Sequence, residues 1–266
     1  MKLLGFIGIG NMGGAIAASA CKAVNAAEIL VSAAHSEKAA AFSEKYGTAP
    51  STNLEIAAQA KYVVLGVKPQ YMEEVLAELR PVLAKREDVI LVTMAAGLTM
   101  QNISDMAGSN FPVIRIMPNT PSLIGEGVIV YDANELVSQS DLDTYLATLA
   151  PAGIVDRIPE QTIDAASAIS GSGPAFTYLF LEALADGAVA CGVPRAKAFE
   201  YGAQTLIGSA KLFLESDCHP AELKEAVCSP GGSTMQGLRA LAAGGMRSAV
   251  MEAVIATYEK NLTFIK

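Results

Sequence analysis

A glycine-rich turn near the start of the chain limits the possible folds more than any other feature. The turn is Gly8-Ile9-Gly10-Asn11-Met12-Gly13, which follows the apolar run Leu3–Ile7 and precedes the helical run Ala15–Val24. In this strand–turn–helix context, the three glycines permit a tight turn, close approach of a pyrophosphate and close packing of the helix. The positive end of the helix attracts the anion. The pattern therefore predicts a dinucleotide-binding unit rather than a merely glycine-rich turn.

Short apolar runs continue through the first half of the chain. They alternate with longer amphipathic segments, such as Ser36–Tyr46, which ends at Gly47, and Pro69–Leu83. The expected strands are Leu3–Ile7, Glu28–Ser32, Tyr62–Gly66, Val89–Thr93, Val113–Met117 and Val128–Tyr131. Most of them lack polar alternation, which is typical of parallel strands covered by helices on both faces. We expect an α/β protein with a Rossmann-like, doubly wound N-terminal domain.

The strand pattern stops after Gly153–Ile158, and the remaining residues have a helical composition. We therefore expect a dinucleotide-binding domain over residues 1–157 and an all-helical domain over residues 158–266. In the second domain, the segment Pro174–Cys191 has only a narrow polar stripe, formed by Tyr178, Glu182 and Asp186. A helix of this kind must be buried on most sides. Its cover comes either from a second subunit or from its own helical bundle.

The composition excludes several classes of protein. The chain has 19 Lys and Arg against 27 Asp and Glu, a formal charge of −8, so it has no basic excess for a nucleic-acid partner. Hydrophobic residues make up 52% and charged residues 17%, which excludes a disordered chain and favours a homo-oligomer. The cysteines lack C-x-x-C spacing, so we expect neither a disulfide scaffold nor a bound metal; they are Cys21, Cys191, Cys218 and Cys228.

Apolar segments that could direct the chain to a membrane are all short. The apolar start Leu3–Ile9 is broken by Gly10 and Asn11, which makes it too short and too polar for a secretory signal. The stretch Val89–Met100 falls well below the ~20 residues that a spanning helix needs. We therefore predict a soluble, cytoplasmic protein with no membrane partner.

The end of the second expected strand bears on the choice of coenzyme. NAD sites usually carry an acid there to bind the ribose hydroxyls. This strand ends in Ser32 and is followed by two alanines and His35, with no acid before Glu37. The missing carboxylate favours NADP, with Ser32, His35, Ser36 or Lys38 near the 2′-phosphate. Alternatively, His35 and Ser36 only cap the next helix.

Further candidate residues follow other strands, where open parallel sheets bind ligands. Val67, Lys68 and Pro69 follow one strand, and Asn119 follows another within Met117–Pro121. The small residues Ala95-Ala96-Gly97 follow a third and leave room for a nicotinamide. The alternative is that the prolines only stiffen loops and that Lys68 is a solvated surface charge.

Two glycine-rich segments with hydroxyl side chains precede helices in the second half, Ser170–Pro174 and Ser229–Thr234. Such segments expose several backbone N–H groups, which suit a carboxylate at the positive end of a helix. Taken alone, each such segment is more often an ordinary capped helix start than a ligand-binding turn.

Five segments together resemble one enzyme family. They are GFIGIGNMGGAI, GVKPQ, RIMPNTP, SGSGPAF and CSPGGSTMQGL, in this order across nearly the whole chain. The combination resembles the pyrroline-5-carboxylate reductases of proline biosynthesis. The resemblance implies an oxidoreductase that reduces L-1-pyrroline-5-carboxylate to L-proline by hydride transfer from NADPH or NADH. It also implies an NAD(P)-binding domain followed by a helical domain that pairs two subunits, often within larger rings.

The resemblance also assigns residues to roles. It places the pyrophosphate on Gly8–Gly13 and other coenzyme contacts near Asn53, Val67, Lys68, Pro69 and Ala96. The substrate carboxylate would be bound by Ser229, Gly231, Gly232 and Ser233, and the hydroxyl at the catalytic site would be that of Thr234. One departure is Ala34-His35, where many relatives have Asn-Arg, so the preference for NADPH is less firmly implied than the reaction.

Two other functions remain open at this point. The first is a β-hydroxyacid dehydrogenase or a related imine reductase, because these enzymes begin with a similar glycine turn. Those dehydrogenases use a lysine from the helical domain, whereas Ser170–Pro174 and the helix after it contain none. The second is a dinucleotide sensor without catalytic activity, against which the intact Ser229–Thr234 segment argues.

Overall fold

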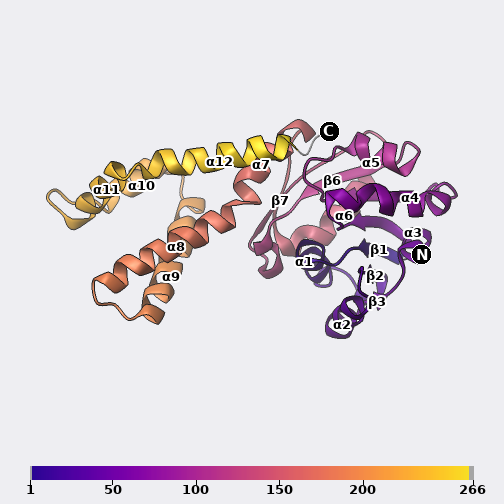
Figure 1. The fold of residues 1–266 in the computed structure, drawn as a ribbon, viewed down its shortest axis with the longest axis horizontal. Coiled ribbons are helices and arrows are strands. Elements are labelled where there is room, and N and C mark those ends of the chain that lie inside the picture. The colour runs from indigo at the N-terminus through magenta and orange to yellow at the C-terminus, as the bar shows by residue number, and fades with distance from the viewer. Residues whose placement is uncertain (1, 264–266) are drawn as a thin grey trace. The chain divides into compact units, whose positions relative to one another are not determined.

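The computed structural model describes residues 2–263, which form two compact units. One unit holds the residues up to Ser172 and those from Thr257 onward, and the other is Gly173–Ala256. The first unit is built on an eight-stranded sheet in the order β3-β2-β1-β4-β5-β6-β7-β8 (Figure 1). Within the described residues, no helix is both long and apolar enough to cross a bilayer.

The sheet is parallel except at one pair of strands. The strands are β1 (Lys2–Ile7), β2 (Ile29–Ser32), β3 (Ala49–Pro50), β4 (Ala60–Leu65), β5 (Ile90–Thr93), β6 (Val113–Met117), β7 (Gly127–Ala133) and β8 (Gly153–Arg157). Strand β7 runs antiparallel to β6, with Met117 opposite Val130, although a parallel sheet was expected throughout. Only Pro118–Glu126 joins the two strands, which is shorter than the dozen or so residues that a parallel crossover needs.

Helices cover both faces of the sheet, as the doubly wound fold predicts. They are α1 (Asn11–Ala20), α2 (Ser36–Tyr46), α3 (Asn53–Gln59), α4 (Met72–Leu83), α5 (Met100–Ala107), α6 (Gln139–Leu149) and α7 (Glu160–Ser170), with the 3-10 turns η1 (Ala26–Glu28), η2 (Pro69–Tyr71), η3 (Thr120–Ile124) and η4 (Ala150–Ala152). The predicted bounds of α2 agree with the structure, whereas Pro69–Leu83 divides into η2 and α4. The first helix begins at Asn11, earlier than predicted, because the chain becomes helical directly after Gly10.

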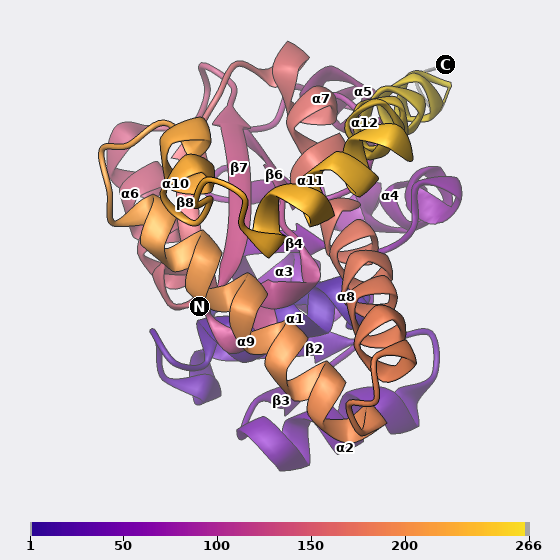
Figure 2. The same ribbon diagram turned by 90° about the vertical axis from the view of Figure 1, so that its left-hand side faces the viewer.

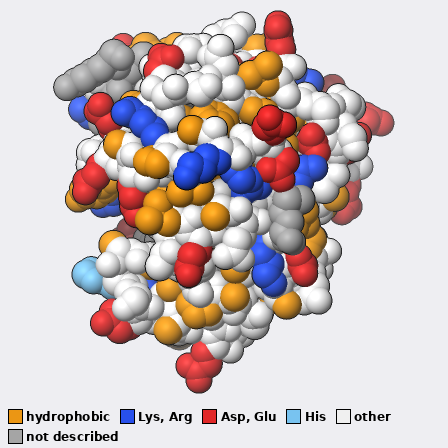
Figure 3. Space-filling model, turned by 90° about the vertical axis from the view of Figure 1, so that its right-hand side faces the viewer, with side chains coloured by type: hydrophobic (Ala, Val, Ile, Leu, Met, Phe, Trp, Pro, Cys, Tyr) orange, Lys and Arg blue, Asp and Glu red, His pale blue; other side chains and the backbone are white. Residues whose placement is uncertain are grey.

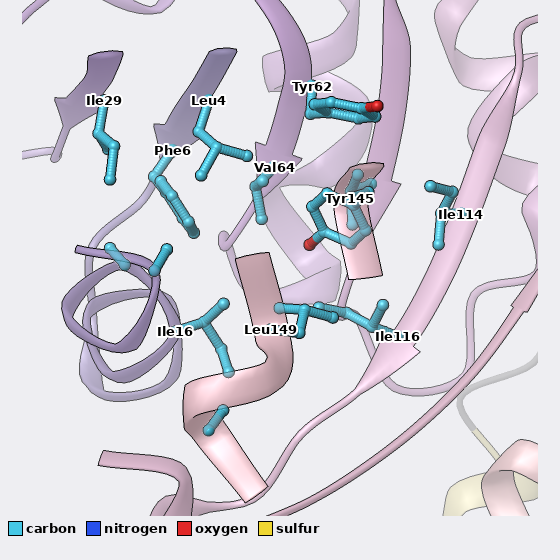
Figure 4. Close-up of a cluster of buried hydrophobic side chains, with 14 of the residues drawn as sticks. Leu4, Phe6, Ile16, Ile29, Tyr62, Val64, Ile114, Ile116, Tyr145 and Leu149 are labelled. Atoms are coloured by element: carbon cyan, nitrogen blue, oxygen red, sulfur yellow. The ribbon is translucent and has the colours of Figure 1, made fainter. Parts of the chain in front are cut away.

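The central strands are apolar on both sides because each side faces a helical layer. Tyr62 and Val64 of β4 join the core beneath α1 and α6, which Figure 4 shows in close-up. Val63 and Leu65 of the same strand join the core beneath α3, α4 and α5. Replacing a buried leucine such as Leu65 with alanine costs about 2–5 kcal/mol, so this packing fixes the helical layer strongly to the sheet.

Helix α7 belongs to the sheet unit, although residues from 158 onward were expected in the second domain. Ile163 is fully buried against Met117 and Val130. The side chain of Arg115, also buried, donates from Nη2 to both carboxylate oxygens of Asp164 at 2.9 Å. Apolar contact and a buried ion pair thus hold α7 on β6 and β7, so the compact unit extends beyond the predicted boundary at residue 157.

The chain returns to the first unit at its C-terminal end. Helix α12 (Met246–Leu262) carries Asn261, whose Nδ2 donates to the backbone oxygen of Asp164 and to Oγ of Ser167. These hydrogen bonds join the last turns of α12 to α7, which explains why the residues from Thr257 onward group with the sheet.

The second unit consists of helices with little buried surface of their own. It contains α8 (Gly173–Ala190), α9 (Arg195–Leu214), α10 (Pro220–Ala226), α11 (Ser233–Ala243) and most of α12. Helix α8 packs along α9 (Figures 1 and 2), and Ala185 is the one buried residue of α8. Tyr178 and Leu179 are 61% and 67% exposed. The other helices of the same chain therefore do not bury α8, which was one of the two explanations for its narrow polar stripe.

Charged side chains of both signs are interspersed with apolar ones on the molecular face that Figure 3 shows. Scattered apolar side chains of this kind are normal on a protein surface.

Candidate coenzyme and substrate sites

Three glycines from different segments meet where β1, α1 and β4 come together. Gly8 has a φ of +94° and follows β1. A Cβ atom on Gly13 would lie 2.2 Å from the carbonyl oxygen of Gly8, and one on Gly66 would lie 2.3 Å from it. Both distances are far inside van der Waals contact, so the backbones cross with no room for a side chain.

Gly10 differs from these three glycines because open space surrounds it. A Cβ atom on Gly10 would meet no heavy atom within 4 Å. Gly10 is the N-cap residue of α1 and supplies no side-chain cap. The first N–H groups of α1 therefore have no side-chain acceptor and point toward this open space, which suits an anion.

A pocket of about 430 Å³ lies at this end of α1. Its walls come from the glycine turn and from the ends of β4 and β5, and they include Gly10, Asn11, Met12, Gly66, Val67, Lys68, Pro69, Met94, Ala95 and Ala96. Lys68 provides a positive charge, and Ala95 and Ala96 after β5 contribute small side chains to the wall. The pocket can accept a pyrophosphate beside a planar ring.

A second pocket, of about 600 Å³, lies at the end of β2. Gly8, Ser32, Ala33, Ala34, Asn53 and Val67 line it, together with Tyr71, Glu74, Val75 and Glu78 from η2 and α4. Ser32 Oγ donates to Asn53 Oδ1 at 2.7 Å, and Asn53 Nδ2 donates to Glu78 Oε2 at 3.1 Å. Val67 lines both pockets, so one extended ligand can occupy them in series.

The second unit presents a separate candidate site at the start of α11. Ser229–Gly232 form a turn in which the N–H of Gly232 donates to the carbonyl oxygen of Ser229 at 2.9 Å. Pro230 in the second position and Gly231, with a φ of +72°, in the third are typical of a type II turn. Gly232 is the N-cap of α11 without a side-chain cap, so the first N–H groups of this helix also lack a side-chain acceptor.

Thr234 lies in the first turn of α11. Its side chain is exposed in the single chain, and its hydroxyl has no hydrogen bond to another residue in the described part of the chain. An exposed threonine hydroxyl that caps nothing contributes little to the helix, so it is available to a ligand.

Comparison with known proteins identifies the family. The family model described as pyrroline-5-carboxylate reductase dimerisation matches residues 160–263, and that described as NADP oxidoreductase coenzyme F420-dependent matches residues 3–97. The pyrroline-5-carboxylate reductase of Escherichia coli (strain K12) is 39% identical over 263 residues, 98% of this chain and 97% of that one. The chain belongs to the pyrroline-5-carboxylate reductase family.

Solved structures of other members of the pyrroline-5-carboxylate reductase family agree with this assignment. The pyrroline carboxylate reductase of Plasmodium falciparum, with NADP bound, superposes with a TM-score of 0.90 at 32% identity, covering 100% of this chain and 98% of that one. The enzyme of Coxiella burnetii gives a TM-score of 0.89 at 30% identity over 100% of this chain and 99% of that one. The family resemblance and the fold class predicted from the sequence are thus confirmed.

Most residues to which the family resemblance assigns coenzyme contacts lie in the two pockets, but four of the predicted residues do not line them. Ile9 is buried in the core, and Gly13 lies beneath the turn. His35 is the exposed N-cap of α2, without a side-chain capping bond. Asn119 is buried, and its amide bonds the backbone at both ends, donating to Ser170 O and accepting from Val128 N. Roles for these four as direct contacts stay predictions.

The sequence reasoning missed the contribution of α4 to the second pocket. Tyr71, Glu74 and Glu78 are spaced by three and four residues, so they lie on one face of the helical segment that follows Pro69. Because Pro69 was already a candidate coenzyme contact, this spacing was the available signal.

The sequence reasoning also missed Asp164 of α7. Its Oδ1 accepts from the N–H of Gly97 at 3.4 Å and so joins α7 to the loop after β5.

The environments of Gly10 and Gly13 predict opposite effects of the same substitution. Gly13→Ala should lower the thermal midpoint of unfolding strongly, because its Cβ would overlap the oxygen of Gly8. Gly10→Ala should leave the unfolding midpoint within about 2 °C of the wild-type value, since the new methyl group meets open space. The same substitution should nevertheless weaken NADPH binding at least about tenfold, because the methyl group fills the approach to the N-terminus of α1.

The two variants are compared by thermal unfolding and by titration with NADPH. Normal NADPH affinity in Gly10→Ala would exclude a pyrophosphate at this turn. A fully stable Gly13→Ala protein would contradict the close backbone crossing.

Proposed function

We propose that this protein reduces L-1-pyrroline-5-carboxylate to L-proline with NADPH or NADH, the final step of proline biosynthesis. The observation that carries the proposal is the similarity of nearly the whole chain to proteins named pyrroline-5-carboxylate reductase. The family model over residues 160–263 spans the Ser229–Thr234 segment. Two pockets in series at the glycine turn and an open helix start at α11 give the proposed ligands places to bind.

The residues around the first unit's pockets fit a nicotinamide coenzyme. The open space at Gly10 and the uncapped N-terminus of α1 suit the pyrophosphate, with Lys68 as the nearby positive charge. Ser32 and Asn53 would contact the adenosine end of the coenzyme, and Ala96 would lie beside its nicotinamide end. When bound, the reduced coenzyme supplies a hydride. The NADP in the relative from Plasmodium falciparum supports NADPH as the coenzyme.

The turn before α11 would bind and orient the substrate. The backbone N–H groups at the start of α11 are suited to the substrate carboxylate, and Ser229 and Ser233 add hydroxyl donors. The hydroxyl of Thr234 would contact the ring nitrogen and stabilise the amine as it forms. A protonated cyclic imine already accepts hydride readily, so the main work of these residues is orientation.

The activity itself is tested by following NADPH oxidation at 340 nm. Racemic pyrroline-5-carboxylate should support turnover with formation of L-proline, whereas a 2-keto acid should not. Turnover with the keto acid alone would favour a hydroxyacid dehydrogenase. Coenzyme binding without turnover on either substrate would favour the sensor.

Thr234 provides a sharper test of the proposed mechanism. Thr234→Ala should lower kcat by roughly ten- to a hundredfold, the effect of losing one hydrogen bond in the transition state, while stability and NADPH affinity remain normal. Thr234→Ser should keep much of the rate because it retains the hydroxyl. Thr162→Ala is a matched control, since it removes an exposed hydroxyl from the first turn of another helix, α7, where that hydroxyl donates to Pro159 O. Wild-type turnover in Thr234→Ala would remove this residue from the mechanism.

We also propose that the chain works as a homodimer or a larger ring. The dimerisation family model over residues 160–263 and the exposed apolar side chains of α8 support this. Light scattering at micromolar concentration should give at least twice the chain mass of 27.6 kDa. A stable, fully active monomer would contradict the proposal. The cytoplasmic location stays a prediction from the sequence.

A further inference from the structure

A carboxylate lines the second pocket, at the end of β2, although β2 itself ends without an acidic residue. It belongs to Glu78 of α4, which lines this pocket together with Ser32, Ala33 and Ala34. In many dinucleotide-binding folds, an acid at the end of the second strand binds the ribose hydroxyls. Here a different element brings the acid to the same pocket.

Two hydrogen bonds connect the end of β2 to this carboxylate. Buried Ser32 donates to Oδ1 of Asn53, and Nδ2 of Asn53 donates to Glu78. The Asn53 amide is therefore fixed between the two, with its oxygen toward β2 and its nitrogen toward α4. The carboxylate of Glu78 keeps further lone pairs, because a carboxylate accepts about four hydrogen bonds and the residues that the structure describes supply one.

Other charged side chains around this end of the site are also acidic. Glu74 lines the same pocket, and Glu55 lines the neighbouring one that shares Ser32, Asn53 and Glu78. The backbone N–H of Thr52 and the hydroxyl of Ser51 donate to Glu55, which lowers the pKa of that carboxyl group. Within the described residues, no Lys or Arg lines either pocket. A 2′-phosphate would enter a negative field here, whereas ribose hydroxyls would find acceptors.

We propose that Glu78 determines coenzyme selectivity by accepting a hydrogen bond from the adenosine ribose of NADH and repelling the 2′-phosphate of NADPH. The inference rests on the proposed coenzyme role of these pockets. It implies that the chain uses NADH as well as NADPH, and that the ratio between them is set on α4 rather than at the end of β2. The competing explanation is that Glu78 only holds Asn53 in place.

The substitution Glu78→Gln separates these explanations. Glutamine keeps the length of the side chain and an oxygen that can accept from Asn53, but it removes the charge. Binding of 2′,5′-ADP and 5′-AMP, adenosine fragments with and without the 2′-phosphate, is measured by calorimetry. We expect affinity for 2′,5′-ADP to rise about fivefold and affinity for 5′-AMP to fall about fivefold. The ratio of kcat/KM for NADPH to that for NADH should rise in parallel.

Glu73→Gln is the matched control. Glu73 is an exposed acid of the same helix that lines neither pocket, so its loss removes the same charge from α4 without changing the site. We expect the ratio of the two fragment affinities to change less than about twofold in this control. Thermal unfolding of both variants should match the wild type, since both side chains are exposed.

Three outcomes would overturn the inference. Equal weakening of both fragments in Glu78→Gln would assign Glu78 to the support of Asn53 alone. An equal shift of the ratio in Glu73→Gln would show a general effect of net charge. Failure of wild-type protein to bind either fragment would remove the coenzyme assignment of these pockets, and this result differs from the other two because it needs no variant.

Discussion

The crossing of Gly8, Gly13 and Gly66 is the constraint on which the first unit depends. The oxygen of Gly8 lies only 2.2 and 2.3 Å from where a Cβ on Gly13 and on Gly66 would be, so the backbones of β1, α1 and β4 are in direct contact. This contact fixes the direction of α1 relative to the sheet, and therefore the place to which its N–H groups point. Both proposed coenzyme pockets open beside this crossing, and Gly8 or Gly66 lines each of them.

A buried ion pair fixes a second part of the first unit, around β5, β6 and α7. Arg115 on β6 reaches Asp164 on α7, and Asp164 in turn accepts from Gly97 after β5. Glu160 accepts from the N–H of Met100 at the start of α5. Helix α7 thus binds the loop after β5 through these two hydrogen bonds. The position of Asp164 is itself fixed, because separating it from Arg115 would leave a buried charge without a partner. The small residues of this loop can line the first pocket without collapsing into it.

Local features explain what the sequence predicted well. Helix α2 was predicted with its observed bounds because Gly47, with a φ of +76°, ends it through a local backbone preference. The attachment of α7 depends on contacts between distant residues, such as Arg115 with Asp164, which no periodicity encodes. The reversal of β7 follows from the short connection Pro118–Glu126, whose length indicates an antiparallel pair only once β6 and β7 are known to be neighbours. The two-residue strand β3 is too short to give a pattern. Among the candidate site residues, those in the glycine turn carry a local signal, whereas Glu78 reaches its pocket only through the packing of α4.

The second unit explains the apolar composition of the chain. Within the described residues, α10, α11 and the part of α12 that belongs to this unit contain no buried residue, and α9 contains only Ala198 and Gly202. Large apolar side chains such as Leu179 and Leu214 remain more than half exposed. Apolar surface of this extent is stable in water only when it is covered, since each exposed Å² forgoes about 25 cal/mol of burial free energy. The apolar residues that make up 52% of the sequence thus serve two purposes, the sheet core within one chain and, under the proposed assembly, the contact between chains.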